Sequence, residues 1–296
     1  MNSELFSIFI PTWNNLPYLK LCIDSILKNS SYKHQIIIHV NEGIDGTLDW
    51  VKQQNLTYTF SKTNIGICRA MNIMRSKTTT NYICYLNDDM YVLPDWDKYL
   101  WEIIKQQSDN KFFVSSTMIQ PHSLLQNQSI QADYGDNLNN FREQDLLKEF
   151  QKYEIKDWFG ATWPPNVVHR DIWDEVGGYS IEFSPGMYSD PDFSAKLWMC
   201  GVRKFIGISK SRVYHFETKS TKRIIKNDGN SQFLFKWGIK QSIFSKEILK
   251  RGEVFNQKNI GIINEHKIKK SLFSTKIKAI WLAIKSKFCI LINWYK

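Results

Sequence analysis

Two adjacent carboxylates that directly follow a short apolar run are the residues of this sequence best suited to chemistry. The run covers residues 82–86, and Asn87, Asp88 and Asp89 come directly after it. A run that ends so abruptly is typical of a buried parallel strand, and the loops after such strands bind ligands in open α/β folds. Two adjacent acids repel each other unless a cation lies between them. Their oxygens suit Mg²⁺ or Mn²⁺ that also holds phosphate oxygens. A solvated Asp-Asp turn is the alternative.

The elements that must position these acids alternate between strands and helices. Strands are predicted over 6–10, 35–40 and 58–60, and each is followed by helical spacing or by residues that begin helices. Such alternation predicts a mainly parallel α/β sheet. The segments after the first two strands, 11–15 and 41–47, are rich in hydrogen-bonding side chains and are predicted to be loops. Each strand would therefore bring polar residues to the same edge of the sheet.

The second half of the sequence predicts less regular structure. The expected elements are a helix over 96–104, a strand over 112–115, loop and helix between 120 and 150, an aromatic turn-forming segment over 158–165, a helix over 172–176, a helix over 193–200, strands over 204–208 and 213–215, and helical structure from Gln232 onward. Gly177 and Gly178 are suited to ending the helix over 172–176. Ser189 or Asp190 could cap the next one, with Pro191 in its first turn.

Composition and charge narrow the class of protein. Hydrophobic residues make up 43% of the 296-residue chain and charged residues 23%, which is ordinary for a globular protein with a sizeable core. The net charge of +10 favours an anionic partner. Much of the excess lies in residues 267–296, which hold eight lysines and no acid. No recognisable nucleic-acid-binding motif is present, so we expect no nucleic-acid partner.

Cysteine usage and the chain ends bear on location. The five cysteines are scattered and lack C-x-x-C spacing, which argues against zinc and against disulfides and favours a reducing compartment. The first five residues do not resemble a signal peptide, and no run of about 20 apolar residues could span a bilayer. We therefore expect a cytoplasmic protein, with peripheral contact at the inner face of the membrane open through the C-terminal tail.

Taken together, five segments in order resemble the family 2 glycosyltransferases of the GT-A fold, over about residues 5–220. They are the loop Pro11-Thr12-Trp13-Asn14, the acidic turn 41–47, the Asn64-x-Gly66-x-x-Arg69-Ala70-x-Asn72 helix start, the D-x-D-like Asn87-Asp88-Asp89, and Asp190-x-Asp192-Phe193-Ser194-x-Lys196. The sequence departs from the family pattern at Asn87, Ser189 and Lys196, where the family has Asp, Glu and Arg. The acidic turn is one residue short and begins with Asn41 instead of Asp, which leaves the choice of nucleobase open.

The resemblance implies a fold and a division of the chain. The fold would be α/β of the GT-A type, with a Rossmann-like, mostly parallel nucleotide-binding sheet and a C-terminal helical extension. Residues 1–115 would form the half that binds the nucleotide sugar, and residues 116–230 the half that binds the acceptor. Residues 231–296 would form the basic helical extension.

The resemblance also implies an inverting, metal-dependent transfer of a sugar from a nucleotide-diphosphate donor, with UDP-sugar favoured, to a glycan or lipid-linked glycan. Asp190 would be the catalytic base; a helix N-cap is the alternative, and Asp192 would be a second candidate base or would orient the helix. Asp89 would bind Mn²⁺ or Mg²⁺, with His215 as a further ligand; a buried or surface histidine without a metal is the alternative for His215. The residues expected to contact the donor are Pro11, Thr12, Trp13, Glu42, Asn64, Gly66, Arg69, Asn87 and Asp88.

Several side chains have weaker roles or open alternatives. Lys219, Lys222 and Arg223 could fold over the diphosphate or form a solvated basic loop. Trp158, Trp163, His169 and Arg170 are weak candidates for acceptor contacts. The tail over 279–292 could lie on an anionic membrane, pack as a terminal helix or form a homodimer contact.

Two other classes of protein remain. One is a basic membrane-surface or nucleic-acid-binding protein with a non-catalytic fold of the same type. The other is a sugar-phosphate nucleotidylyltransferase, but that class has a Gly-rich, basic loop after its first strand. Residues 11–15 hold no Gly, Arg or Lys, so this reading ranks last.

Overall fold

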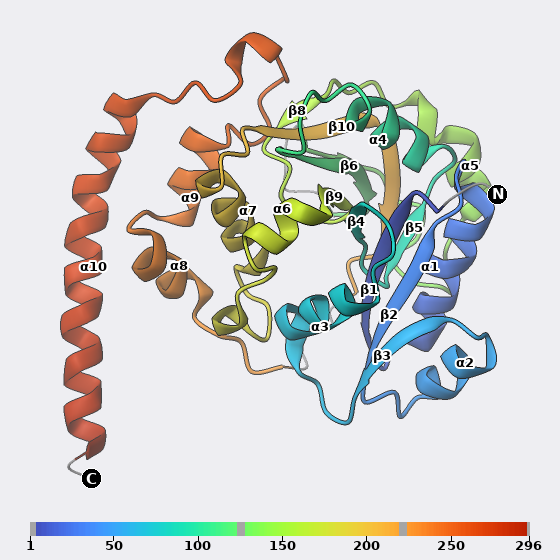
Figure 1. Cartoon of the computed structure of the whole chain (residues 1–296), viewed down its shortest axis with the longest axis horizontal. Helices are drawn as coiled ribbons and strands as arrows, with labels where there is room; N and C mark the ends of the chain where they lie inside the picture. The colour runs from blue at the N-terminus through green and yellow to red at the C-terminus, as the bar shows by residue number, and fades with distance from the viewer. Residues whose placement is uncertain (1–3, 123–127, 219–223, 295–296) are drawn as a thin grey trace.

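A single curled sheet organises the chain (Figure 1), which we describe from a computed structural model covering residues 4–122, 128–218 and 224–294. Within these residues the sheet has ten strands. Its main path is β3 (Thr57–Ser61), β2 (Gln35–Asn41), β1 (Phe6–Trp13), β4 (Tyr82–Tyr85), β9 (Asn166–His169), β6 (Phe112–Gln120), β10 (Lys204–His215) and β5 (Met90–Val92). Off this path, β7 (Ser129–Gln131) pairs with β6, and β8 (Trp158–Phe159) pairs with β10.

The direction of the strands changes across the sheet. The first four strands of the path, β3 to β4, are parallel, as the sequence predicts. Strand β9 then runs antiparallel to both of its neighbours, β4 and β6, while β10 is parallel to β6. The sheet is therefore mixed in its second half. All four residues of β9 are buried, but only Val167 and Val168 among them are apolar. So short a pattern carries no information about strand direction.

Helices cover both faces of the sheet. Side chains alternate between the faces along a strand: Ile8 and Ile10 join the core cluster of α1 (Leu16–Asn29) and α4 (Trp96–Ile104), whereas Phe9 joins the cluster of α3 (Gly66–Met74) and α7 (Ser189–Met199). The remaining helical elements are α2 (Thr47–Gln53), η1 (Arg75–Lys77), α5 (Glu143–Glu149), η2 (Phe150–Lys152), α6 (Arg170–Glu175), η3 (Ile181–Phe183), α8 (Gly229–Trp237), α9 (Gln241–Ile243), η5 (Phe244–Ile248), η6 (Gln257–Asn259) and α10 (Glu265–Trp294).

The predicted end of the first strand and the predicted start of the helix that carries Asp190 are both wrong. Residues 11–13 were predicted to be loop, but Pro11 continues β1 opposite His39. Strand β4 pairs with β1 only as far as Phe9, so Pro11 lies where one flank of β1 has no ladder and the missing N–H is tolerated. Asp190 is not a helix cap either. Helix α7 begins after Tyr188, at φ 68°, without a side-chain cap.

Strand β10 and the C-terminal region also differ from the prediction. The two strands predicted over 204–208 and 213–215 are one strand with an irregularity between Ile208 and Arg212. A β-bulge of this kind interrupts the apolar pattern without ending the strand. The structure after Trp237 is not continuously helical, because turns separate the short α9 and η5 from α10. Helix α10 lies beside the body of the protein (Figure 1).

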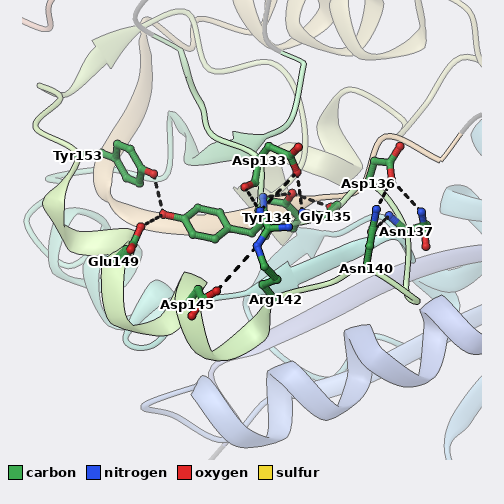
Figure 2. Close-up of polar contacts among 11 residues, drawn as sticks. Asp133, Tyr134, Gly135, Asp136, Asn137, Asn140, Arg142, Asp145, Glu149 and Tyr153 are labelled. Atoms are coloured by element: carbon green, nitrogen blue, oxygen red, sulfur yellow. Dashed lines mark hydrogen bonds and ion pairs between the residues drawn. The ribbon is translucent and has the colours of Figure 1, made fainter.

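The Asn- and Asp-rich part of the 120–150 segment is held by its own side chains (Figure 2). The Asn140 and Asn137 amides both donate to Asp136 Oδ1, and the Gly135 N–H donates to Asp133 Oδ1. Short polar side chains offer the backbone such local partners in place of a strand ladder. This part of the segment therefore forms a loop, as its sequence predicts, and α5 follows it.

Gly66, at the start of α3, lies against the segment that precedes α7. Its φ is +76°, and a Cβ atom there would lie 2.8 Å from the Pro185 Cα. The next N–H, of Ile67, donates to the Pro185 carbonyl at 2.9 Å. The absence of a side chain at Gly66 therefore lets α3 contact the segment that precedes α7.

We predict that Gly66→Ala lowers the free energy of unfolding more than Gly177→Ala does. Both glycines have positive φ, +76° and +69°, but a Cβ at Gly177 would meet nothing within 4 Å. Both variants carry the backbone strain of about 1–2 kcal/mol, and Gly66→Ala adds an overpacking cost of about 1–3 kcal/mol. Urea unfolding followed by circular dichroism measures the difference. Equal losses would show that the contact with Pro185 relaxes freely.

Candidate active site

A cavity of about 460 Å³ opens beyond the ends of β1, β2, β4 and β10. Ten of the predicted site residues line it: Pro11, Thr12, Trp13, Asn64, Gly66, Asn87, Asp88, Asp89, Asp190 and His215. The carboxyl ends of parallel strands meet at one edge of a sheet, which brings the segments near residues 12 and 88 together. The antiparallel pairing of β10 with β5 places His215 opposite Met90, next to the acids.

Glu42 and Arg69 are predicted donor contacts that do not line the cavity. The Glu42 carboxylate accepts hydrogen bonds from Trp13 Nε1 at 2.9 Å and from Asn14 Nδ2 at 3.0 Å. Glu42 thus fixes the Trp13 indole without lining the cavity itself. Arg69 is exposed on α3. Lys219, Lys222 and Arg223 lie outside the described residues.

The weak acceptor candidates also lie away from this cavity. None of Trp158, Trp163, His169 and Arg170 lines it. The Trp158 ring is buried, and its Nε1 donates to Thr117 Oγ1 at 3.0 Å.

Asn41 and Asn64 shape the loops that border the cavity between β2 and α3. Asn41 Oδ1 accepts hydrogen bonds from Ile65 N at 2.9 Å and from Ser61 Oγ at 3.1 Å. Asn64 Oδ1 accepts one from Gly66 N at 2.9 Å. These amides tie the end of β2 to the start of α3. An Asp at position 41 would accept the same bonds, so the exchange for Asn preserves this anchoring.

Asp89 is the best-supported acid of the site. Thr218 donates to its Oδ2 through the backbone N–H at 2.9 Å and through Oγ1 at 2.7 Å, and His215 Nε2 lies 3.5 Å from the same oxygen. Burial alone would raise the pKa of Asp89. The facing His215 and the Thr218 hydrogen bonds outweigh burial and hold that pKa below its usual range. Asp89 is therefore a carboxylate at neutral pH.

His215 and Asp88 complete the charged group. The His215 Nδ1 atom lies 3.2 Å from Gln120 Oε1, so the ring is held from both sides. Burial lowers the pKa of His215, but the Asp89 carboxylate more than compensates and the pKa is raised. Asp88 Oδ2 accepts a hydrogen bond of 2.6 Å from Thr12 Oγ1. The Thr12 hydroxyl thus links β1 to the acidic loop.

A divalent metal fits the chemistry of these side chains only if the substrate supplies further ligands. Within the described ranges, no three His, Cys, Asp or Glu side chains gather in a metal-binding cluster. Asp89 and His215 form a two-residue set next to Asp88. Mg²⁺ and Mn²⁺ sites in phosphate-transferring enzymes commonly use one or two carboxylates together with substrate phosphates and water. The donor set fits such a site.

Asp190 faces the same cavity from the other half of the sheet. Burial raises the pKa of Asp190 to about 7, although the hydrogen bond from the Tyr179 hydroxyl, 3.0 Å from Oδ1, favours the charged form. Within the described part of the chain, no basic side chain contributes to this shift. A carboxylate with a pKa near neutrality can both accept and release a proton at physiological pH.

Tyr179 is a site residue to which the sequence assigned no role, although the segment Gly177-Gly178-Tyr179 stands where the family usually has Gly-Gly-Phe. The Asn72 side chain binds the Tyr179 backbone on both sides, donating to its carbonyl at 2.7 Å and accepting from its N–H at 2.8 Å. The Tyr179 ring stacks on Phe193 with centroids 4.7 Å apart. Asn72 and Phe193 both belong to the segments that resemble the family pattern. Their contacts fix the tyrosine that donates to Asp190.

Asp192 does not reach the cavity. It is fully buried, and its Oδ1 lies 2.8 Å from Trp237 Nε1 and 3.0 Å from Lys236 Nζ in α8. Asp192 therefore anchors α7 to α8, in line with the expectation that it orients the helix. The turn Pro185-Gly186-Met187 and Glu217 line the cavity without having been proposed. The Pro-Gly pair three residues before Ser189 was the available signal.

Comparison with known proteins shows the family. The family model for glycosyl transferase family 2 matches residues 7–163. A 101-residue segment is 36% identical to an uncharacterised glycosyltransferase of Mycoplasma genitalium, covering 31% of this chain and 33% of the relative. Hyaluronan synthase of Pasteurella multocida is 27% identical over 229 residues, which are 74% of this chain and 21% of the synthase. The chain belongs to glycosyl transferase family 2.

Solved structures show the same fold. The structure of GalNAc-T7 with UDP, GalNAc and Mn²⁺ superposes with a TM-score of 0.57 at 17% identity, covering 83% of this chain and 50% of that one. Residues 1–349 of S. aureus TarS give a TM-score of 0.54 at 15% identity, covering 72% and 60%. The predicted GT-A fold is thereby confirmed. The chain spans about a third of the length of the Mycoplasma genitalium relative and about a fifth of the hyaluronan synthase. No helix within the described ranges is both long and apolar enough to cross a bilayer.

We predict that Asp190→Asn raises the free energy of unfolding at pH 8 but not at pH 4. The folded-state pKa of Asp190 is raised, so its protonated form stabilises the fold below the unfolded pKa, and this stability is lost as the pH rises through about 7. A full shift would amount to about 4 kcal/mol. Asp190 faces the open cavity, so solvent reduces the expected gain to about 2 kcal/mol.

Urea unfolding of the wild type and of Asp190→Asn at both pH values measures this effect. Asp49→Asn, on an exposed position of α2, is the matched control. A gain at pH 8 no larger than that of the control would contradict the raised pKa.

Proposed function

We propose that the chain is an inverting, metal-dependent glycosyltransferase that moves a sugar from a nucleotide-diphosphate donor, UDP-sugar first, to a hydroxyl of a glycan or lipid-linked glycan. The observation that carries the proposal is that Thr12, Asp88, Asp89, His215 and Asp190 line one cavity. Thr12, Asp88 and Asp89 come from residues 1–115, whereas His215 and Asp190 come from residues 116–230.

Asp89 and His215 would hold Mn²⁺ or Mg²⁺. When bound, the ion neutralises charge on the leaving diphosphate. Asp88, held by Thr12, adds a second acid beside this position. The structure of GalNAc-T7 with UDP, GalNAc and Mn²⁺, and that of TarS with UDP, support this assignment by analogy of fold.

The nucleotide would bind along the ends of β1 and β2. Trp13, fixed by Glu42, offers an aromatic face for the base. Asn64, Gly66 and Pro11 form the adjoining wall of the cavity. Asn87 lies directly before the acids and would hydrogen-bond the ribose or a water molecule.

Asp190 would remove the proton from the acceptor hydroxyl as its oxygen attacks the anomeric carbon opposite the leaving diphosphate, which inverts the configuration. The raised pKa suits a general base near neutral pH. The Tyr179 hydroxyl orients the carboxylate through its 3.0 Å hydrogen bond. The named relatives include a hyaluronan synthase and a chondroitin synthase, which supports a polysaccharide as the acceptor.

We predict that Asp89→Ala and Asp190→Asn separate binding from transfer. UDP with Mn²⁺ should raise the melting temperature of the wild type, and Asp89→Ala should abolish this shift because a metal ligand is lost. Asp190→Asn should retain the shift but lose transfer by about a thousandfold, since it removes a general base. Differential scanning fluorimetry and release of UDP from a panel of UDP-sugars measure the two effects.

Asp192→Asn is the control for a nearby acid outside the cavity. UDP with Mn²⁺ should raise the melting temperature of folded Asp192→Asn as it does that of the wild type. The absence of a shift with UDP, GDP or dTDP in the wild type would sink the proposal. Full transfer activity in Asp190→Asn would remove Asp190 as the base.

We also propose that α10 attaches the protein to an anionic membrane surface, such as the inner face of a cytoplasmic membrane. Ile268 and Leu272 pack against the core of the protein. Farther along the helix, five large apolar side chains on one face are 57–72% exposed: Phe273, Ile277, Ile280, Trp281 and Ile284. Lys267, Lys269, Lys270 and Lys276 are exposed around them. An apolar face with surrounding lysines suits the interface of a bilayer that contains anionic lipids.

We predict that the protein sediments with phosphatidylcholine vesicles that contain about 30% phosphatidylserine, and much less with pure phosphatidylcholine. The double variant Phe273→Ser/Trp281→Ser should weaken this binding by at least about tenfold, because two large apolar side chains no longer enter the bilayer. Leu27→Ser/Met199→Ser changes two exposed apolar residues elsewhere and should have little effect. A dimer in light scattering that dissociates in the α10 variant would instead assign this face to a homodimer.

A further inference from the structure

A second cavity, of about 750 Å³, lies beside the irregular part of β10 and is larger than the candidate active site. The two cavities share no lining residue. We call the second one the basic cavity and define it by Tyr99, Tyr153, Lys156, Lys210 and Arg212. Among the described residues that line it, Glu154 is the one acid and Lys156, Lys210 and Arg212 are the basic side chains. Its electrostatic potential therefore favours an anion.

Arg212 is the buried charge of the basic cavity. Its residue is 7% exposed, and its guanidinium donates to the carbonyls of Ser209, Phe150 and Tyr153. Within the described residues it forms no ion pair with a carboxylate. Carbonyl dipoles satisfy three of its five N–H donors but do not cancel its charge. Burial lowers the pKa of Arg212 without removing the charge at neutral pH.

The β-bulge of β10 sets the position of a second cation. The register of β10 against β6 shifts between Ile208 and Arg212, and Lys210 is exposed between buried neighbours. The Ser209 N–H and hydroxyl are fixed by Asp157 Oδ1 at 2.8 and 2.7 Å. Bulges commonly redirect a side chain next to a functional site. Here the bulge presents Lys210 at the cavity, near Lys156, and neither lysine has an ion-pair partner among the described residues.

Aromatic rings form the walls of the basic cavity. The partly exposed Tyr99 ring lies 6.0 Å from Lys210 Nζ. Tyr153 is held by its hydroxyl, 2.6 Å from that of Tyr134, which also donates to Glu149 at 2.8 Å (Figure 2). The wall is thus fixed before any ligand arrives. Rings beside cations suit a ligand with an apolar face and an anionic group.

We propose that the basic cavity binds an anionic saccharide, in which Tyr99 contacts a sugar ring and Lys156, Lys210 and Arg212 contact its carboxylate or phosphate. The size of the cavity is within the usual range of sites for ligands of this kind. Binding at this site does not require the transfer reaction, since the lining residues are separate from those of the candidate active site.

The test uses the full-length protein and isothermal titration calorimetry with three ligands: tetragalacturonate, neutral maltotetraose and inorganic phosphate. We expect tetragalacturonate to bind at least about tenfold more tightly than maltotetraose, because only the former pairs with the cations. Lys156→Gln/Lys210→Gln should weaken it by about tenfold, and Lys33→Gln/Lys52→Gln, at exposed positions of equal charge, by less than about twofold. Circular dichroism verifies that each variant is folded.

Tyr99→Leu distinguishes a sugar from a free phosphate. It should weaken tetragalacturonate by at least about threefold, because an aromatic contact is lost, and leave phosphate binding unchanged. Equal affinity for the acidic and neutral tetramers would overturn the proposal, as would an equal loss in the two lysine pairs. An undiminished affinity in Lys156→Gln/Lys210→Gln would place the ligand elsewhere. Phosphate that binds as tightly as the tetramer, with no effect of Tyr99→Leu, would also overturn a saccharide site.

Discussion

The unequal stabilisation of three carboxylates is the constraint on which the candidate active site depends. Asp88, Asp89 and Asp190 line one small cavity in a protein whose net charge is otherwise strongly positive. Each is compensated differently. Thr12 donates to Asp88, and Thr218 and His215 stabilise the charge of Asp89. Among the described residues Asp190 receives a hydrogen bond only from the Tyr179 hydroxyl, which does not outweigh the burial that raises its pKa. Chemically similar side chains thus acquire two different protonation behaviours, which suit the proposed roles of metal ligand and general base.

The contacts that join the two halves of the sheet maintain this arrangement. The Asn72 amide binds both sides of the Tyr179 backbone, and the Gly66 backbone lies against Pro185. Both contacts start from α3 and end in the segment that leads to α7. Asp192, buried against Lys236 and Trp237, fixes the other side of α7. Asp190 is therefore located by its neighbours in sequence and by two other helices. The proposed role of Asp190 as a general base needs such support, because its carboxylate would have to lie within hydrogen-bond distance of the acceptor oxygen.

The positive charge of the protein is concentrated in regions with different physical settings. On α10 the lysines surround an exposed apolar face, whereas in the basic cavity Arg212 is buried among carbonyl groups. The first arrangement suits a flat, anionic, partly apolar surface, and the second suits a small anionic ligand. Neither arrangement overlaps with the cavity that holds Asp89 and Asp190. The net charge of +10 therefore does not point to a single partner.

The sequence by itself determined the strand–helix alternation of the first 90 residues and the order of the segments that line the candidate active site. Apolar periodicity and polar strand ends are local signals, and in parallel strands they imply convergence at one edge. Only the tertiary structure decided that β9 runs antiparallel, that Pro11 remains in a strand, and that Glu42 supports Trp13 from outside the cavity. It also decided the raised pKa of Asp190 and brought the 150–158 segment to Arg212. These features depend on desolvation and on contacts between residues far apart in the chain, and no local pattern encodes either.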